Sequence, residues 1–346
     1  MAPTTTNSPL GIVDEIVIAG SPQNRHRSRA GIQLLPNGDL FVAYRVGWDM
    51  FAVPHGGVVG TWSKDGGRTW EEPLPLAAEP GWDWFGAQRL FRLADGSLLM
   101  LVGKARWDID LFLTYSTRSR DGGRTWEEMG PEIAVFASFS EPYGQGVTRG
   151  LPDNQIILGF HGSDQPGAPS MAGVSCSSDE GRSWSAPVVI ASQSGVNFRE
   201  ADLIRLDDGR MLAVLRTDEP PYESFQSWSD DDGRTWTPIA KTGFKGHCPR
   251  LFRLRHGILC VYRDMEPTRP GISYSVTYND GHTWRDGGSL YASPGAYSGW
   301  ASACGYPAVV RLPGGEFFCV FHTDFVDENS EIRGLLLRDL QPYSSL

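Results

Sequence analysis

Cysteines are few in this chain, and it has no long hydrophobic run. The 346 residues include five cysteines, an odd number without any Cys-x-x-Cys spacing, which argues against a disulfide framework or a zinc site. No apolar stretch in the sequence approaches the roughly 18 residues that a membrane helix requires. We therefore expect no metal, no cofactor and no membrane partner.

Positive charge is also in short supply. Lysine and arginine number 31 against 41 aspartates and glutamates, which gives a net charge of −10 and an isoelectric point near 5.2. Such a chain is a poor partner for nucleic acid or for an anionic membrane. The N-terminus lacks the basic start and the apolar stretch of a signal peptide. We therefore expect a cytoplasmic protein, or a secreted one from which a leader was removed.

Turn-forming residues, in contrast, are abundant, with 41 glycines and 24 prolines. An eight-residue pattern, Ser-x-Asp-x-Gly-x-Thr-Trp, recurs five times, the last copy more loosely, and begins at residues 63, 119, 177, 229 and 277. Its serine and aspartate can bond the amides of a tight turn, its glycine permits a positive φ, and its tryptophan can pack between neighbouring sheets. A repeat of about 50 residues matches one four-stranded sheet with its loops.

A second repeated element, which consists of a strand, a two-residue turn and another strand, lies upstream of each motif and once more near the C-terminus. Its copies cover residues 30–46, 88–102, 145–161, 201–216, 249–263 and 307–322. Turn dipeptides such as Asn-Gly favour hairpins. The sequence thus predicts an all-β fold, a single domain over residues 1–346 that is built as a six-bladed β-propeller. We expect the apolar residues 11–19 to close the last blade as an N-terminal strand.

Residues suited to chemistry recur at matching places in these hairpins. Counting from the turns puts Arg29, Glu200 and Tyr306 on first strands, which line the channel of a propeller. The same counting puts basic residues at the ends of second strands: Arg45, His161, Arg216, Arg263 and His322. Because equivalent strand positions surround a common axis, we expect these side chains to converge on one site that can bind an anion.

The motif and the site residues together resemble the catalytic domain of sialidases over essentially the whole chain. The positions that match the sialidase pattern are Arg29 in the first blade, Glu200 and Arg216 in the fourth, Arg269 or Arg263 later, and Tyr306 in the last. The resemblance implies five Asp-boxes, arginines that grip a sugar carboxylate, a tyrosine nucleophile and a glutamate base. A phenol with a pKa of about 10 is a poor nucleophile until a carboxylate takes its proton, and a guanidinium can grip a carboxylate through two hydrogen bonds.

The chain departs from the sialidase pattern at two positions. The catalytic aspartate of sialidases aligns with Gly57, and Asp49 or His55 in the same loop can take its place. His322 stands where sialidases have a glutamate that holds the first arginine. Trp48 precedes Asp49 and offers an aromatic face on which a sugar ring can stack.

Three functions are compatible with these residues. The first is a glycoside hydrolase of sialidase type that removes a terminal acidic sugar, with Tyr306 as nucleophile, Glu200 as base and Asp49 as acid. The second is a polysaccharide lyase acting on a uronate-containing glycan, in which arginines acidify the C–H beside the carboxylate and histidine or tyrosine takes the proton. The third is a carbohydrate-binding propeller without catalysis. For the two enzymes we expect a glycan partner with a carboxylate-bearing sugar.

Overall fold

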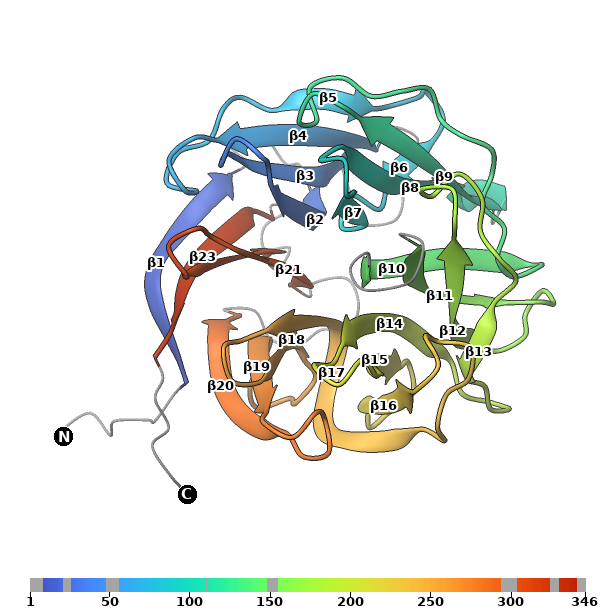
Figure 1. Cartoon of the computed structure of the whole chain (residues 1–346). Helices are drawn as coiled ribbons and strands as arrows, with labels where there is room; N and C mark the ends of the chain where they lie inside the picture. The colour runs from blue at the N-terminus through green and yellow to red at the C-terminus, as the bar shows by residue number, and fades with distance from the viewer. Residues whose placement is uncertain are drawn as a thin grey trace.

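The computed structural model describes residues 9–20, 26–47, 56–109, 111–147, 155–293, 304–323 and 330–340, with the side chains of residues 145–147 left out. These residues form strands and one short 3-10 helix, η1 (Trp107–Ile109). The strands form five antiparallel sheets that surround a common centre (Figure 1). The fold is therefore all-β with a propeller arrangement.

Three sheets follow one another along the chain and have four strands each. The first contains β2 (His26–Leu34), β3 (Leu40–Gly47), β4 (Gly57–Ser63) and β5 (Leu74–Ala77). The second contains β6 (Asp83–Phe85), β7 (Leu90–Arg92), β8 (Leu98–Arg106) and β9 (Leu111–Ser119). The third contains β10 (Phe139–Val147), β11 (Ile156–Ser163), β12 (Met171–Ser177) and β13 (Val188–Ala191).

The next sheet has seven strands, and it corrects the predicted architecture. Its strands, in order across the sheet, are β14 (Phe198–Arg205), β15 (Met211–Thr217), β16 (Glu223–Ser229), β17 (Ala240–Arg253), β18 (Ile258–Asp264), β19 (Gly271–Thr277) and β20 (Arg285–Ala292). The prediction of a six-bladed propeller is wrong, because the described strands give four four-stranded blades and this one larger sheet. The reason lies in β17, whose first half pairs with β16 and whose second half pairs with β18 without a break.

The last sheet joins the two ends of the chain. It contains β21 (Gly305–Arg311), β22 (Phe317–His322), β23 (Ile332–Asp339) and, at its outer edge, β1 (Leu10–Ala19). Strands β1 and β23 are antiparallel, with Leu10 opposite Asp339 and Ala19 opposite Ile332. The inner strands touch in a closed ring in the order β2, β7, β10, β14, β17 and β21, so residues far apart in sequence meet at the centre.

The first four repeated motifs form turns with the same hydrogen bonds, and in the fifth Asn279 replaces the aspartate, so that its Nδ2 donates to the Thr283 hydroxyl. In the first, the Gly67 amide donates to Ser63 Oγ at 2.8 Å, and the Thr69 amide and hydroxyl both donate to the Asp65 carboxylate, at 2.9 and 2.6 Å. Gly67 has a φ of 96°, and a Cβ there would lie 2.4 Å from the ring of Phe318 in the neighbouring sheet. Only glycine tolerates both the backbone conformation and this close approach. The motif therefore fixes the turn and its contact with the adjacent sheet.

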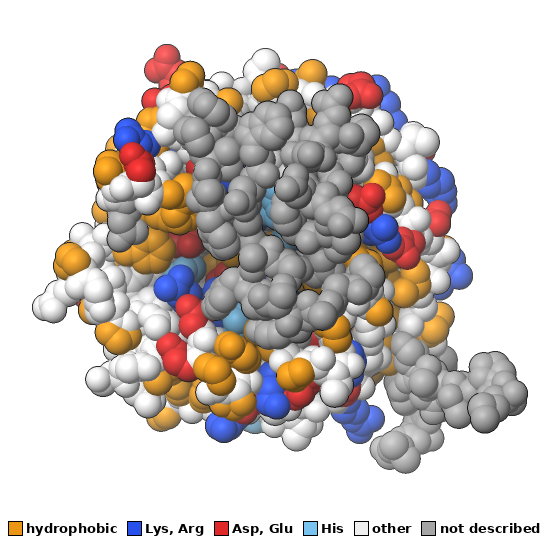
Figure 2. All heavy atoms as spheres, turned by 180° about the vertical axis from the view of Figure 1, so that it is seen from behind, with side chains coloured by type: hydrophobic (Ala, Val, Ile, Leu, Met, Phe, Trp, Pro, Cys, Tyr) orange, Lys and Arg blue, Asp and Glu red, His pale blue; other side chains and the backbone are white. Residues whose placement is uncertain are grey.

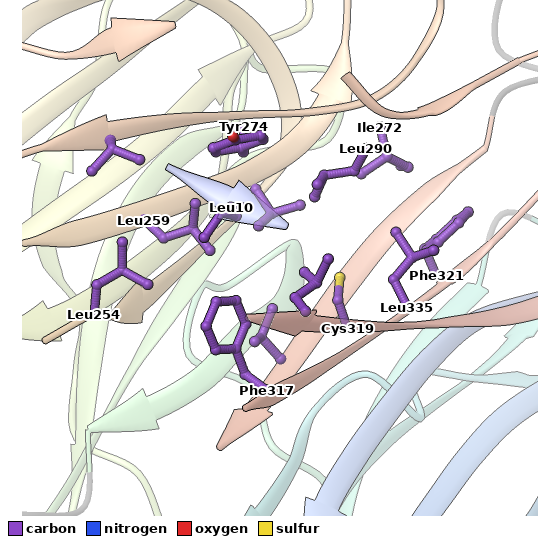
Figure 3. Close-up of a cluster of buried hydrophobic side chains, with 14 of the residues drawn as sticks. Leu10, Leu254, Leu259, Ile272, Tyr274, Leu290, Phe317, Cys319, Phe321 and Leu335 are labelled. Atoms are coloured by element: carbon purple, nitrogen blue, oxygen red, sulfur yellow. The ribbon is translucent and has the colours of Figure 1, made fainter. Parts of the chain in front are cut away.

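Hydrophobic side chains fill the spaces between neighbouring sheets. One cluster lies between the seven-stranded sheet and the last sheet, and Figure 3 shows Leu259, Ile272 and Tyr274 of the former near Phe317 and Leu335 of the latter. Burying such a side chain contributes about 1.5–3 kcal/mol. Among the described residues, no helix is long and apolar enough to span a bilayer. The same residues contain no group of His, Cys, Asp and Glu arranged to hold a metal ion.

Candidate active site

A repeated irregularity in the inner strands creates the candidate site. Arg29, Glu200, Cys248 and Tyr306 have φ values of 55°, 55°, 54° and 51°, and each lies where the ladder of its sheet shifts register. A left-handed conformation costs a non-glycine residue about 1–2 kcal/mol, and such strain clusters at functional sites. The bulges sit where the inner strands meet at the centre of the ring.

Tyr306 and Glu200 form the centre of the site. The Tyr306 hydroxyl donates to Glu200 Oε1 at 2.9 Å. The second carboxylate oxygen, Oε2, accepts from Arg216 Nε at 2.6 Å and from the backbone amide of Cys248 at 3.1 Å. These four residues come from β21, β14, β15 and β17 and are all buried. The structure thus brings together the predicted nucleophile, its predicted base and one predicted arginine.

The charges around this pair set its protonation. Burial by itself raises the pKa of Glu200, but the charge and hydrogen bond of Arg216, with a contribution from His161, outweigh burial and set the pKa at about 2. Burial raises the pKa of the Tyr306 phenol well above 10, and the Arg29 charge opposes part of that rise. Glu200 is therefore ionised and Tyr306 neutral near neutral pH, the states that a base and its unactivated nucleophile require.

A second ionised cluster lies beside Tyr306 and centres on Glu141 of β10. Arg89 donates to Glu141 Oε1, Arg29 Nη1 lies 3.5 Å from the same oxygen, and His161 Nε2 lies 3.4 Å from Oε2. Burial opposes ionisation of Glu141, but Arg89, His161 and Arg29 together hold its pKa far below the usual range. The Arg29 guanidinium also lies over the Tyr306 ring, 5.2 Å from its centroid, so this cluster places positive charge next to the phenol.

Arg45 forms a separate buried ion pair. It donates to both oxygens of Asp83 on β6, at 2.8 and 3.0 Å, and Asp83 also accepts from the indole of Trp107 at 2.9 Å. Arg45 Nη1 lies 3.4 Å from His26 Nδ1. Burial and then the charges of Arg45 and Arg29 lower the pKa of His26 to about 3. The Arg45 guanidinium is thus engaged within the protein, and Arg45 as a substrate-binding residue stays a prediction.

The remaining predicted residues with described positions lie in three different surroundings. Arg263 is buried at the end of β18, where its Nε donates to the carbonyl of Cys304, close to Tyr306 in sequence. The His322 ring stacks near the Tyr306 ring, with centroids 5.9 Å apart. Arg269 makes its ion pairs elsewhere, with Asp264 at 2.6 Å and Asp286 at 2.5 Å. Asp49, His55 and Trp48 lie outside the described residues.

Sequence reasoning missed two residues of the site, Glu141 and Arg89. In the third hairpin the same counting gives Gln145 in place of Glu141, because the bulge there is longer. The four steps from Tyr143 to Val147 face only two steps, from Gly159 to Ile157. Glu141 could have been found as the cross-strand partner of His161, which the sequence already predicted, because the two residues lie directly opposite each other. Arg89 follows a break in the inner strand between β6 and β7, which the hairpin pattern did not reveal.

Charged and histidine side chains also show at one face of the molecule. Figure 2 shows histidine, basic and acidic side chains close to the middle of this face, with hydrophobic ones nearby. Such a mixture at the hub of a ring of sheets is typical of a ligand site. The fold and site together define a class of protein: a ring of Asp-box sheets around a buried centre of tyrosine, glutamate and arginine.

The comparisons identify the family. The model of the BNR repeat-like domain matches residues 90–319, more than half of the chain, and the chain therefore belongs to this family. The predicted membership of the sialidase-like Asp-box (BNR) superfamily is confirmed. No curated protein sequence matches the chain.

Solved structures support the same fold. A protein of unknown function from Dyadobacter fermentans is 22% identical with a TM-score of 0.80, over 96% of this chain and 99% of that one. An α-L-arabinanase from Penicillium chrysogenum, solved with arabinobiose, is 14% identical with a TM-score of 0.69, over 95% of this chain and 99% of the arabinanase. The NanB sialidase of Streptococcus pneumoniae is 12% identical with a TM-score of 0.69, over 97% of this chain and 71% of the sialidase. At these identities the likeness shows the fold alone, although two of the three are glycoside hydrolases.

Proposed function

We propose that the chain is a glycoside hydrolase that removes an acidic sugar from a glycan, with Tyr306 as nucleophile and Glu200 as its base. The observation that carries this proposal is the 2.9 Å hydrogen bond from the Tyr306 hydroxyl to Glu200 Oε1. Arg216 and the Cys248 amide hold the other carboxylate oxygen, so Oε1 faces the phenol. Glycosidases with a tyrosine nucleophile are a known variant of the two-carboxylate mechanism.

The proposed first step moves two protons, forms one bond and breaks one. The Tyr306 oxygen bonds the anomeric carbon, its proton passes to Glu200 Oε1, and the bond to the leaving-group oxygen breaks as that oxygen takes a proton from an acid. Because Glu200 has a pKa of about 2 and the Tyr306 pKa is raised, this transfer is unfavourable before substrate binds. Positive charge that develops on the sugar in the transition state draws the phenol oxygen toward the anomeric carbon. The proton transfer then becomes favourable.

The arginines support a carboxylate on the substrate. Arg29 stands next to the Tyr306 ring, and Arg89 lies behind Glu141. Among the described residues, Arg89 Nε and Nη1 and Arg263 Nη2 are buried without a hydrogen-bond partner. Near the phenol, four arginines (29, 89, 216 and 263) face Glu141, Glu200 and Asp218. Such an excess of buried positive charge favours an anionic ligand.

Elimination is the competing reaction, and the geometry of His161 argues against that residue as its base. A lyase needs a base that is free to take a carbon-bound proton. His161 Nδ1 accepts from the Glu200 amide at 3.4 Å, and its Nε2 lies beside Glu141, so both ring nitrogens are engaged. Tyr306, in contrast, already directs its proton to Glu200. This contrast favours hydrolysis.

The proposal is tested by incubating the protein with a panel of sialosides, uronate glycosides and neutral arabinosides. The masses of the products are then measured by mass spectrometry. We expect a carboxylate-bearing substrate to be hydrolysed, so that the masses of the two products add up to the mass of the substrate plus one water. Tyr306→Phe and Glu200→Gln should each lower kcat by roughly 10³-fold or more while the chain stays folded, and Tyr278→Phe, at the surface, should not. An unsaturated product lighter by one water would identify a lyase, and full activity of Tyr306→Phe would remove the nucleophile.

The acid is tested through the leaving group. If Asp49 or His55 donates the proton, Asp49→Asn or His55→Gln should lower kcat about 10²–10⁴-fold on natural glycosides. The same variant should act almost normally on aryl glycosides, whose phenolate leaving groups need no proton. Equal losses on both substrate types would show that neither residue is the acid.

A further inference from the structure

Four partly buried aromatic side chains of the described residues stand apart from the hydrophobic clusters that fill the spaces between the sheets. Every other partly buried aromatic side chain in that part of the chain packs against one of these clusters. The four exceptions are Trp107, Phe112, Phe139 and Tyr222. Apolar side chains that gather in one place, partly exposed and without a place in the core, mark a ligand-binding surface.

Two of these rings meet histidines of the candidate active site. The centroid of the Phe139 ring lies 5.9 Å from that of His161, and the centroid of the Tyr222 ring lies 5.4 Å from that of His247. Nδ1 of His161 accepts from the Glu200 amide at 3.4 Å, and Nδ1 of His247 lies 3.3 Å from the guanidinium that pairs with Glu200. Both rings therefore border the site.

Phe139 belongs to a group of three rings, Trp107, Phe112 and Phe139, here called the aromatic wall. The Phe112 ring meets the Trp107 ring at 4.8 Å and the Phe139 ring at 5.3 Å, in both cases edge to face. Trp107 lies in η1, and the other two lie at the starts of β9 and β10. Ile109, also in η1, is 59% exposed, more than any other large hydrophobic side chain of the described residues. These ends of the second and third sheets therefore present apolar surface to solvent.

The aromatic wall is continuous with the Tyr306 centre. The Phe112 ring meets the buried Phe85 ring at 5.0 Å. The Arg29 guanidinium lies over the Phe85 ring, 5.0 Å from its centroid, and over the Tyr306 ring, 5.2 Å from its centroid. One ring and one cation thus connect the wall to the proposed nucleophile. A sugar unit next to one bound at Tyr306 can therefore rest on the wall.

We propose that the aromatic wall binds a neutral sugar, so that the chain selects glycans in which the acidic sugar is linked to a neutral one. The inference rests on the proposed function, which places the acidic sugar at Tyr306 and the sugar that carries the leaving-group oxygen beside it. The apolar C–H face of that second sugar packs on the rings. A neutral unit suits the wall because Arg106 and Asp108, which flank Trp107, pair with each other at 2.9 and 2.8 Å.

Binding of four probes tests the proposal by isothermal titration. Sialyl-galactose and methyl sialoside share one acidic sugar, and glucuronyl-galactose and methyl glucuronide share another, so that within each pair only the neutral galactose differs. The titrations use the whole chain with Tyr306→Phe, in which the probes stay intact. We expect galactose to tighten binding about tenfold in the pair whose acidic sugar the site accepts, because galactose covers apolar surface on the wall.

Phe112→Leu and Phe139→Leu, each added to Tyr306→Phe, test the rings themselves. Leucine keeps an apolar side chain but has no flat face, so each variant should reduce the advantage of galactose to about threefold or less. The affinity for the methyl glycoside should stay within about twofold. Tyr278→Leu, which removes an exposed ring elsewhere on the surface, is the matched control and should keep the full advantage. Circular dichroism checks that every variant is folded.

The outcomes separate this inference from the proposed function. Equal affinities within both pairs, no binding of any probe, or the full advantage of galactose in both leucine variants would each overturn the inference. An equal loss for both members of a pair would also overturn it, because the rings would then only support the Tyr306 centre. Absence of turnover on every glycan would overturn the proposed function alone, because the advantage of galactose is measured without cleavage.

Discussion

Two buried ion pairs occupy equivalent places in this chain and serve different surroundings. Arg45 lies near the end of β3 opposite Ser28, and Arg216 lies near the end of β15 opposite Arg199; in each case the partner immediately precedes a bulge. Arg216 pairs with Glu200 of its own sheet, and Glu200 also accepts a hydrogen bond from the Tyr306 hydroxyl. Arg45 pairs with a carboxylate of the next sheet that is bound by an indole.

The comparison shows that repeated sheets place equivalent residues in the same geometry, although those residues can have different functions. The same strand end provides a guanidinium in both sheets, and the partner carboxylate decides what it does. Where the carboxylate also faces a phenol, the pair can move a proton. Where it faces the indole of Trp107, the pair ties two sheets together.

The largest expected effect is on stability and concerns Arg45→Met. Removing one partner of a buried ion pair leaves an uncompensated charge, here Asp83, and costs about 3–5 kcal/mol. Chemical denaturation should show this loss, whereas the activity of the folded fraction should change little. A loss of activity without a loss of stability would show that Arg45 acts on substrate instead.

Arg216→Met also removes one partner of a buried ion pair, and its specific effect is on the activation free energy of the reaction, which should change by less. Glu200 then loses the cation that keeps its pKa at about 2, so its pKa rises. The acidic limb of the pH–activity profile should move to higher pH, and kcat should fall on the order of 10²-fold, about 2.7 kcal/mol. An unchanged pH–activity profile would show that the ionisation of Glu200 does not control the reaction.

Per pH unit, the smallest effect is the pH dependence of stability at the two centres. His26 has a pKa of about 3 in the folded chain and 6.5 as the ordinary value. Below pH 6.5 the unfolded chain therefore binds a proton that the folded chain does not, and stability falls by about 1.4 kcal/mol per pH unit. Glu200, with its pKa lowered from 4.5 to about 2, contributes stability above pH 4.5 that is lost only as pH falls toward 2.

Calorimetry between pH 8 and pH 4 separates these two contributions. We expect the unfolding temperature to fall already below pH 6.5, before Glu200 begins to titrate. His26→Gln should reduce that slope, and His256→Gln, in an exposed turn, should not. A curve that is flat down to pH 4.5 would show that the buried histidine has no such effect.

Much of the site was readable from the sequence because four inner strands share one bulge. Counting back from a hairpin turn found Arg29, Glu200 and Tyr306, since in those sheets the bulge inserts the same extra residue. In the second and third sheets glycines, Gly86 and Gly144, adopt the positive φ, and the bulges are longer. A fixed count then fails.

The sequence by itself determined the turns, the sheet hairpins and the family, because their hydrogen bonds and periodicity act within a few neighbouring residues. It also placed Tyr306 and Glu200 on strands that face the hub. Only the tertiary structure decided that β17 runs unbroken through two sheet halves, that Glu141 holds Arg29 and Arg89, and that Arg269 turns away to Asp264 and Asp286. These outcomes depend on which distant backbones and charges come within a few ångströms of each other, and local sequence patterns do not encode that distance.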